Sequence, residues 1–279
     1  MCGIAGVMTV DGTPPAAATL DRLERALAHR GPDGHGRLVR GDTALVHTRL
    51  AIIDLTTGDQ PLFDKGGAAL VANGEIYNHP ELRQGLLADA DFATHSDCET
   101  ILPLYRRYGL DCLAHLRGMY AFALHDPDAG SLFLARDPFG IKPLYYTEGA
   151  FGFAFASEPQ ALIAAGLAAA EVERRAVGEL LQLQFTTGAD SIFKDIHRLL
   201  PGEALLVKGG RVTERRRQPA LPAGRPKAMS EVAALAELDR VLTDSVLVHQ
   251  RSDVPYGLFL SSGIDSTAIL AVMARLNDS

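Results

Sequence analysis

The chain has 279 residues, of which 47% are hydrophobic, so it is long enough for two domains with a sizeable core. Its 27 basic and 34 acidic residues give a formal net charge of -7, which argues against a nucleic-acid-binding surface and favours small-molecule partners. Three cysteines without a CxxC spacing argue against a disulfide framework or a zinc site, and we expect no metal ligands. No basic leader or long apolar run is present, so we expect a soluble, cytoplasmic protein without a membrane segment.

The first residues, Met1-Cys2-Gly3, place a thiol next to the start of the chain. If Met1 is removed, Cys2 carries both a nucleophile and an α-amine, whose reference pKa of about 8 lies close to that of the thiol. One residue can then supply both nucleophile and base. The alternative interpretation is a small, buried cysteine after an initiator methionine.

Hydrophobic periodicity and turn residues predict an α+β domain at the N-terminus. Strands are predicted at 2–9, within 43–54 (two strands interrupted at Thr48-Arg49), and at 68–72, 120–124, 131–135, 144–147, 151–156 and 203–207. Helices are predicted at 17–28, 80–87, 98–108, 158–165 and 174–183. Asn73-Gly74 has the composition of a turn, and Ser96 with Glu99 that of a capping box. Because strands and helices come in blocks, we expect a layered αββα domain.

The polar, Pro- and Gly-rich stretch 211–229 predicts a linker, so that 2–210 form the first domain and 230–279 begin a second. There we expect a helix from 230 to about 250, an apolar strand at 255–260 and a helix at 267–276. The intervening loop Ser261 to Ser266 has the strand–loop–helix arrangement that binds anions through backbone N–H groups. These elements alone cannot bury a parallel sheet, so we expect the truncated start of an α/β domain.

Six motifs, in this order and spacing, resemble the class II glutamine amidotransferase domain of glutamine-hydrolysing asparagine synthetases. They are Met1-Cys2-Gly3-Ile4-Ala5-Gly6, Arg30-Gly31-Pro32-Asp33, His47-Thr48-Arg49-Leu50-Ala51-Ile52-Ile53-Asp54, Asn73-Gly74-Glu75-Ile76-Tyr77-Asn78, Ser96-Asp97-Cys98-Glu99 and Arg136-Asp137-Pro138-Phe139-Gly140-Ile141-Lys142-Pro143-Leu144-Tyr145. Asp253 to Gly257 and Ser261 to Ser266 resemble the start of the family's ATP-pyrophosphatase synthetase domain, with Ser262 where the common form has glycine. The resemblance implies a four-layer αββα N-terminal-nucleophile glutaminase fold, followed by the start of an adenine nucleotide α-hydrolase-like domain.

The resemblance also implies a role for each site residue. The thiol of Cys2 would attack the side-chain amide of glutamine, and the amide of Asn73 with the backbone N–H of Gly74 would stabilise the oxyanion. Arg49 would bind the α-carboxylate of glutamine, Asp97 its α-ammonium, and Glu75 would add a polar contact. The residues that would bind ATP or pyrophosphate are Ser261, Ser262, Gly263, Asp265 and Ser266.

Structural alternatives remain open for several of these residues. Arg49 could be a paired structural arginine, and a carboxylate at the position of Asp97 is stabilised by the helix dipole without any ligand. Cys98 and Cys112 are interpreted as core residues, and the segment from Arg136 to Tyr145 as support for the sheet and the domain contact.

The resemblance implies an asparagine synthase in which ammonia from glutamine attacks β-aspartyl-AMP. ATP and Mg²⁺ would serve the full-length synthetase, and the glutaminase half-reaction would need no cofactor. The partners would be glutamine, ATP and aspartate, without nucleic acid or membrane, and the sequence leaves open whether the chain forms a homodimer. The alternatives are an amidotransferase with another acceptor, such as a peptide, and a non-catalytic interaction module. An intact Cys2 and glutamine pocket argue against the β-lactam-forming relatives.

Overall fold

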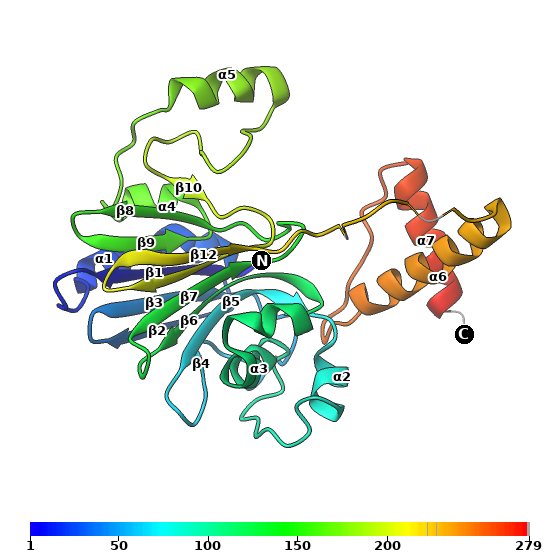
Figure 1. Ribbon diagram of the computed structural model, residues 1–279, viewed down its shortest axis with the longest axis horizontal. Helices are drawn as coiled ribbons and strands as arrows, with labels where there is room; N and C mark the ends of the chain where they lie inside the picture. The colour runs from blue at the N-terminus through cyan, green and yellow to red at the C-terminus, as the bar shows by residue number, and fades with distance from the viewer. Residues whose placement is uncertain (222, 227, 278–279) are drawn as a thin grey trace.

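The computed structural model describes residues 1–221, 223–226 and 228–277, and its main body is a sandwich of two antiparallel sheets (Figure 1). In the described residues, the first sheet has the strand order β10-β8-β9-β1-β3-β2 and the second the order β12-β11-β7-β6-β5-β4. The first contains β1 (Gly3–Thr9), β2 (Gly34–Arg40), β3 (Thr43–Arg49), β8 (Tyr145–Gly149), β9 (Gly152–Ala156) and β10 (His197–Arg198). The second contains β4 (Leu62–Phe63), β5 (Ala69–Ile76), β6 (Gly118–Asp126), β7 (Ser131–Arg136), β11 (Glu203–Lys208) and β12 (Arg211–Arg217).

Helices cover the outer face of each sheet. Against the first sheet lie α1 (Ala17–Leu27) and α4 (Pro159–Ala164), and Leu20, Leu23 and Leu27 of α1 pack in one apolar cluster with the strands. Against the second lie α3 (Ile101–Tyr108) and the 3-10 helix η3 (Gly109–His115), whose Leu104 and Cys112 join the cluster on that face. A third cluster, which includes Ile4, Met8, Val71 and Leu134, fills the space between the sheets. The order helix, sheet, sheet, helix confirms the predicted αββα layers.

The predicted helices at 17–28, 158–165 and 174–183 form, the last as α5 (Arg174–Leu183). The predicted helix at 80–87 is shorter, α2 (His79–Gln84), and the one at 98–108 begins as the 3-10 helix η2 (Cys98–Thr100) before α3. A further 3-10 turn, η1 (Ala28–Arg30), follows α1.

Several local predictions are wrong. Asn73-Gly74 is not a turn but lies inside β5, opposite Ala121 and Tyr120 of β6, because the sheet overrides the local preference of the dipeptide. Residues 50–54 form no strand, and β2, whose alternating small and polar residues gave a weak signal, pairs with β3 instead.

The predicted capping box at Ser96 does not form. No side chain caps η2, and the Glu99 carboxylate instead accepts hydrogen bonds from the backbone N–H groups of Ala93 (2.7 Å) and Thr94 (2.9 Å). Glu99 thereby holds the loop that precedes the 3-10 turn, a tertiary task that sequence spacing does not reveal.

The arginine-rich segment Arg211–Arg217, which we expected to open the linker, is strand β12 at the edge of the second sheet and pairs with β11. The stretch that connects the two parts of the chain therefore starts at Gln218. Beyond it, α6 (Glu231–His249) begins at the N-cap Ser230, and α7 (Ile264–Asn277) packs beside α6 (Figure 1). The predicted strand at 255–260 is absent from the described structure, where no strand lies beside it to pair, and Phe259 is 95% exposed.

The helical pair contacts the sandwich at a small number of points. Asp244 forms an ion pair with Arg117, Arg251 forms one with Glu81 (2.9 Å), and the ring of His249 lies 4.4 Å from that of Tyr77. Within the described residues, no helix is both long and apolar enough to cross a bilayer.

Candidate active site

The candidate site is a cavity of about 270 Å³ where the two sheets meet. Cys2 immediately precedes β1, and Arg49 ends β3, which runs antiparallel to β1 so that Gly3 lies opposite Thr48. From the other sheet, β5 lies against both β1 and β3. The cavity is lined by all six residues that the sequence suggested for glutamine chemistry: Cys2, Arg49, Asn73, Gly74, Glu75 and Asp97.

The thiol of Cys2 is held in the cavity by the residue after Arg49. The backbone N–H of Leu50 donates to Sγ at 3.4 Å, and Sγ lies 3.5 Å from the Leu50 carbonyl oxygen. Burial raises the pKa of the thiol, although the Leu50 N–H, the chain's amino group, Lys142 and Arg49 act in the opposite direction. A thiol with a raised pKa is protonated at neutral pH, so a base must remove its proton before it can attack.

The amino end of the chain lies beside this thiol. Met1 is 56% exposed, and the backbone oxygen of Cys2 accepts a hydrogen bond from Nε of Arg30 (2.9 Å). Burial lowers the pKa of the Met1 amine, and the cations Arg30 and Lys142 lower it further against the opposing effect of Cys2. The lowered pKa leaves a larger fraction of the amine unprotonated, and so able to accept a proton, near neutral pH.

Asn73 offers an unused donor. Its side chain is 1% exposed, and its Nδ2 has no hydrogen-bond partner among the described residues. Leaving such a buried group unpaired costs about 1 to 3 kcal/mol, so an orphan amide at a cavity wall is a feature that a ligand can satisfy.

The adjacent Gly74 has a different reason to be glycine from the one we expected. A Cβ there would lie 2.6 Å from the Met119 carbonyl oxygen and 2.7 Å from Cα of Tyr120, both on β6. The glycine is thus required by the close approach of β5 to β6, rather than by a turn.

The guanidinium of Arg49 is already paired. Its Nη1 forms an ion pair with Asp59 (2.7 Å), while its Nη2 donates to the carbonyl oxygens of Asp54 and Ile53, the latter at 3.4 Å. The side chain of Arg49 is 8% exposed, whereas that of Asp59 is 79% exposed. The bond to Asp59 is therefore the one that a ligand carboxylate could replace at low cost.

Asp97 and Glu75 provide the negative charge of the cavity. Burial raises the pKa of Asp97 to about 6, against the effect of hydrogen bonds from the Ile76 and Cys98 backbone, and its Oδ2 accepts from the Ile76 N–H at 2.6 Å. Burial also raises the pKa of Glu75, against the effects of Lys142 and His249. A ligand ammonium group would favour the ionised form of Asp97.

Lys142 lines the cavity, although sequence reasoning gave its segment only a supporting role. The preceding Asp137 is fully buried, and its carboxylate accepts from the backbone N–H groups of Ile141 (2.9 Å) and Lys142 (3.0 Å), which fixes the loop. Nζ of Lys142 contacts Sδ of Met1 at 3.6 Å, and burial lowers the pKa of this lysine. The available signal was a single lysine in the otherwise apolar run Gly-Ile-Lys-Pro-Leu.

The two cysteines predicted as core residues, Cys98 and Cys112, have different surroundings. Cys112 lies in the apolar cluster under the second sheet, whereas Cys98 belongs to that cluster and also lines the cavity. In the part of the chain that the structure describes, no three His, Cys, Asp or Glu side chains gather as a metal site.

The residues suggested for ATP lie elsewhere, in the exposed loop that leads into α7. The hydroxyls of Ser261 and Ser266 are 3.1 Å apart, and that of Ser266 donates to the Gly263 carbonyl oxygen. Ser262 has a φ of +61°, a conformation that costs a side-chain-bearing residue about 1 kcal/mol and that glycine adopts freely. Hydroxyl groups at the start of a 14-residue helix suit a phosphate group.

Two facing antiparallel sheets lie between helical layers, and Cys2 directly precedes the central strand β1 of the first sheet. The fold is shared with a B. subtilis glutamine phosphoribosylpyrophosphate amidotransferase, with a TM-score of 0.57 and 23% identity over 77% of this chain and 49% of that one. The chain belongs to the family described as "Glutamine amidotransferase domain", which matches residues 1–217. The family described as "Asparagine synthase" matches residues 237–279.

Two curated relatives cover almost the entire chain. A putative glutamine-hydrolysing asparagine synthetase from Mycobacterium tuberculosis is 38% identical over 99% of this chain, and the amidase chyE from Penicillium rubens is 35% identical over 99%. The chain spans 46% and 43% of the lengths of these two proteins.

Proposed function

We propose that this protein hydrolyses glutamine at Cys2 and passes the ammonia to an ATP-activated aspartate, as a glutamine-hydrolysing asparagine synthase. The observation that carries the glutaminase part is the unpaired, buried amide of Asn73 in the same cavity as the Cys2 thiol. A stably folded protein keeps an unsatisfied donor of this kind at a cost, and an oxyanion formed beside the thiol would satisfy it.

The chemistry follows from the protonation states of the site. Once Met1 is removed, the α-amine of Cys2 takes the proton of the thiol, and Sγ forms a bond to the amide carbon of glutamine. The carbonyl oxygen becomes an oxyanion that Asn73 and the N–H of Gly74 stabilise. When the carbon–nitrogen bond breaks, the α-ammonium returns the proton to the leaving nitrogen, which departs as ammonia. Water then hydrolyses the thioester to glutamate and restores Cys2.

The rest of the substrate is held by opposite charges. The α-carboxylate of glutamine takes the place of the exposed Asp59 on Nη1 of Arg49, and the α-ammonium pairs with Asp97. Glu75 lies on the same wall and contacts the polar end of the substrate. These pairings hold the amide at a fixed distance from Sγ, which is the main contribution of substrate positioning to the rate.

The ATP-dependent half of the proposal rests on the match of residues 237–279 to the asparagine synthase family and on the loop before α7. ATP supplies the activation of the acceptor carboxylate. The residues Ser261, Ser262, Gly263, Asp265 and Ser266 would bind ATP or its pyrophosphate, and Mg²⁺ would accompany the nucleotide. The division of the chain into a glutaminase part, a connecting stretch from Gln218 to Met229 and a synthetase part is proposed on the same grounds.

The test of the glutaminase is Cys2→Ala. We expect glutamine hydrolysis to fall to less than about a hundredth while the circular dichroism spectrum and glutamine binding persist, because the substitution is small and removes only the nucleophile. A chain that retains Met1 keeps the thiol and should also lose turnover, since the α-amine is then on the wrong residue. Full activity with Met1 in place would show that another base serves Cys2.

The runner-up is an amidotransferase with a different acceptor, which the 35% identity to the amidase chyE favours. Release of pyrophosphate from ATP, measured with aspartate and with other carboxylates, separates the two. A non-catalytic module predicts neither glutamine turnover nor labelling of Cys2 by a glutamine analogue.

A further inference from the structure

The turn after β3 is held together around Asp54, a residue with no role in the scheme above. Asp54 is 5% exposed and has a φ of +56°, a left-handed conformation that favours glycine and that aspartate adopts more often than most other residues. Its carbonyl oxygen accepts from Nη2 of Arg49 and from the N–H of Gly58 (3.2 Å). A Cβ on Gly58 would lie 2.6 Å from Nη2 of Arg49, so the turn closes tightly on the guanidinium. Nη2 is thus fixed by the protein, while Nη1 faces the exposed Asp59.

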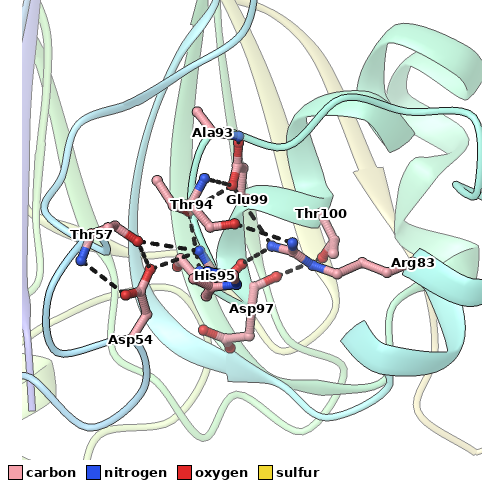
Figure 2. A network of polar contacts seen from close by, with 10 residues as sticks. Asp54, Thr57, Arg83, Ala93, Thr94, His95, Asp97, Glu99 and Thr100 are labelled. Carbon is pink, nitrogen blue, oxygen red and sulfur yellow. Dashed lines mark hydrogen bonds and ion pairs between the residues drawn. The ribbon is translucent and has the colours of Figure 1, made fainter.

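The carboxylate of Asp54 reaches the segment that leads to Asp97. It accepts from the N–H (2.9 Å) and hydroxyl (2.6 Å) of Thr57 and from the backbone N–H of His95 (2.9 Å). Figure 2 shows it between Thr57 and the His95 segment, two residues before Asp97. These hydrogen bonds outweigh the opposing effect of burial and lower the pKa of Asp54, so it is ionised at neutral pH. One side chain therefore ties the turn that carries Arg49 to the segment that carries Asp97.

The remaining polar group of Asp54 is bound from the far end of the chain. Its backbone N–H donates to Oδ2 of Asp253 at 2.7 Å, and the N–H of Asp253 donates to the carbonyl oxygen of Ile52 at 2.9 Å. Asp253 lies four residues after the end of α6, in the segment that leads to the loop before α7. This two-bond clasp is the contact between the helical part and the turn beside the glutamine cavity.

We propose that Asp54 and Asp253 are positioning residues of the glutamine site, and that the Asp253 clasp couples the placement of the helical part to glutamine affinity. This inference rests on the proposed function, because it names the contacts that hold Arg49 and Asp97 at the positions where they would bind glutamine. When Asp253 is bound, the strained turn is fixed and Arg49 keeps its orientation. When it is released, the turn can relax from positive φ, and the guanidinium loses the carbonyl groups that aim it. Since coupling is reciprocal, bound glutamine in turn favours the clasped arrangement.

The first test is Asp253→Ala, with steady-state glutaminase kinetics. We expect the KM for glutamine to rise about five- to tenfold, the lower range of known coupling effects, with kcat within about twofold, because the turn positions substrate and does not touch the reacting atoms. Asp253→Asn keeps an oxygen that can accept from the Asp54 N–H and should restore most of the affinity. A drop in kcat at constant KM, or no change in either, contradicts the proposal.

The matched control is Asp244→Ala. It removes the ion pair to Arg117, which also joins α6 to the sandwich but does not touch the turn. We expect an unchanged KM. An equal rise in both variants would mean that general docking of the helices, rather than the clasp, sets the affinity.

The second test separates the effect of backbone strain at Asp54 on glutamine affinity from the effect of the Asp54 carboxylate. Asp54→Gly tolerates the positive φ but removes the bonds to Thr57 and His95, and we expect a rise in KM as large as that of Asp253→Ala or larger. If Asp54→Gly binds glutamine as well as the parent, the carboxylate has no positioning role.

Glutamine binding to Cys2→Ala variants, measured by calorimetry, gives the affinity without turnover. It therefore tests the glutaminase proposal and the clasp proposal separately. Absence of binding by the Cys2→Ala parent overturns the glutaminase proposal and this one together. Equal dissociation constants for the parent and for the Asp253→Ala form overturn only the clasp. A dissociation constant about five- to tenfold higher for the Asp253→Ala form than for the parent supports the clasp.

Discussion

At Asp97, the stability of the folded protein and the proposed function make opposite demands on the charge of the side chain. It is 4% exposed, and burial raises its pKa to about 6, so its charge is unfavourable in the empty cavity at neutral pH. The folded state binds the proton of the Asp97 carboxyl group more tightly than the unfolded chain does. The contribution of Asp97 to the free energy of unfolding is therefore most favourable below about pH 4. It is lost as the pH rises through 6. A substrate ammonium would repay the cost.

We therefore predict that Asp97→Asn stabilises the ligand-free protein at pH 8 by up to about 3 kcal/mol and weakens glutamine binding severely. The asparagine oxygen can still accept from the Ile76 N–H, and no charge is buried. Denaturant unfolding of both proteins at pH 8 and pH 4 measures the effect, and the difference between them should vanish at the lower pH. A variant that is less stable at pH 8 would contradict the assigned cost of the buried charge.

The sequence was informative at the residue scale because six of its motifs resemble those of a known family in order and spacing. It correctly placed six residues at one cavity, although their catalytic and binding roles stay predictions. It did not single out Lys142, for which the available signal was a lone lysine in an otherwise apolar run. Nor could it reveal that Arg49 is aimed by the carbonyl groups of its own turn, since a backbone contact leaves no side-chain signature.

At the scale of elements, the periodic helices and apolar strands were predictable, and two of the missed strands share a cause. Strand β2 alternates glycine and polar residues, and β12 is rich in arginine, so neither carries the apolar pattern of a strand. Both lie at the edge of a sheet, where pairing on one side supplies the structure. Asn73-Gly74 was misread for the opposite reason, because a strong local turn signal was overridden by pairing with β6.

Gly74 gives the prediction at this scale. Gly74→Ala would force a Cβ against the β6 backbone, which cannot move as a side chain can, so we expect a loss of about 1 to 3 kcal/mol and of glutaminase activity. The control is Gly178→Ala in α5, where nothing lies within 4 Å of the added Cβ. That substitution should stabilise the protein by up to about 1 kcal/mol, because alanine is the better helix former. Chemical denaturation measures both, and equal effects would show that the gap between β5 and β6 is wider than described.

At the scale of the whole molecule, the sandwich and the helical pair meet through few contacts, and the connecting stretch after β12 is largely exposed in its described residues. The sandwich has its own apolar clusters within and outside its sheets, which is what an independently folding unit requires. The sequence suggested a boundary at 211, and the pairing of β12 with β11 moves it to Gln218, because removal of β12 would expose the edge of β11.

The last prediction concerns a chain cut at this boundary, which removes the clasp. A chain that ends at Gln218 should fold and hydrolyse glutamine with a kcat within about threefold of the parent, because Cys2, Asn73 and Asp97 all precede the cut. It lacks Asp253, however, so its KM should rise by about the same five- to tenfold factor as in Asp253→Ala. Adding Asp54→Gly to the shortened chain should raise the KM further, because it removes the carboxylate bonds to Thr57 and His95, which do not depend on Asp253. Steady-state kinetics of the four proteins measure this, and a shortened chain with the KM of the parent would show that the turn holds its shape without the helical part.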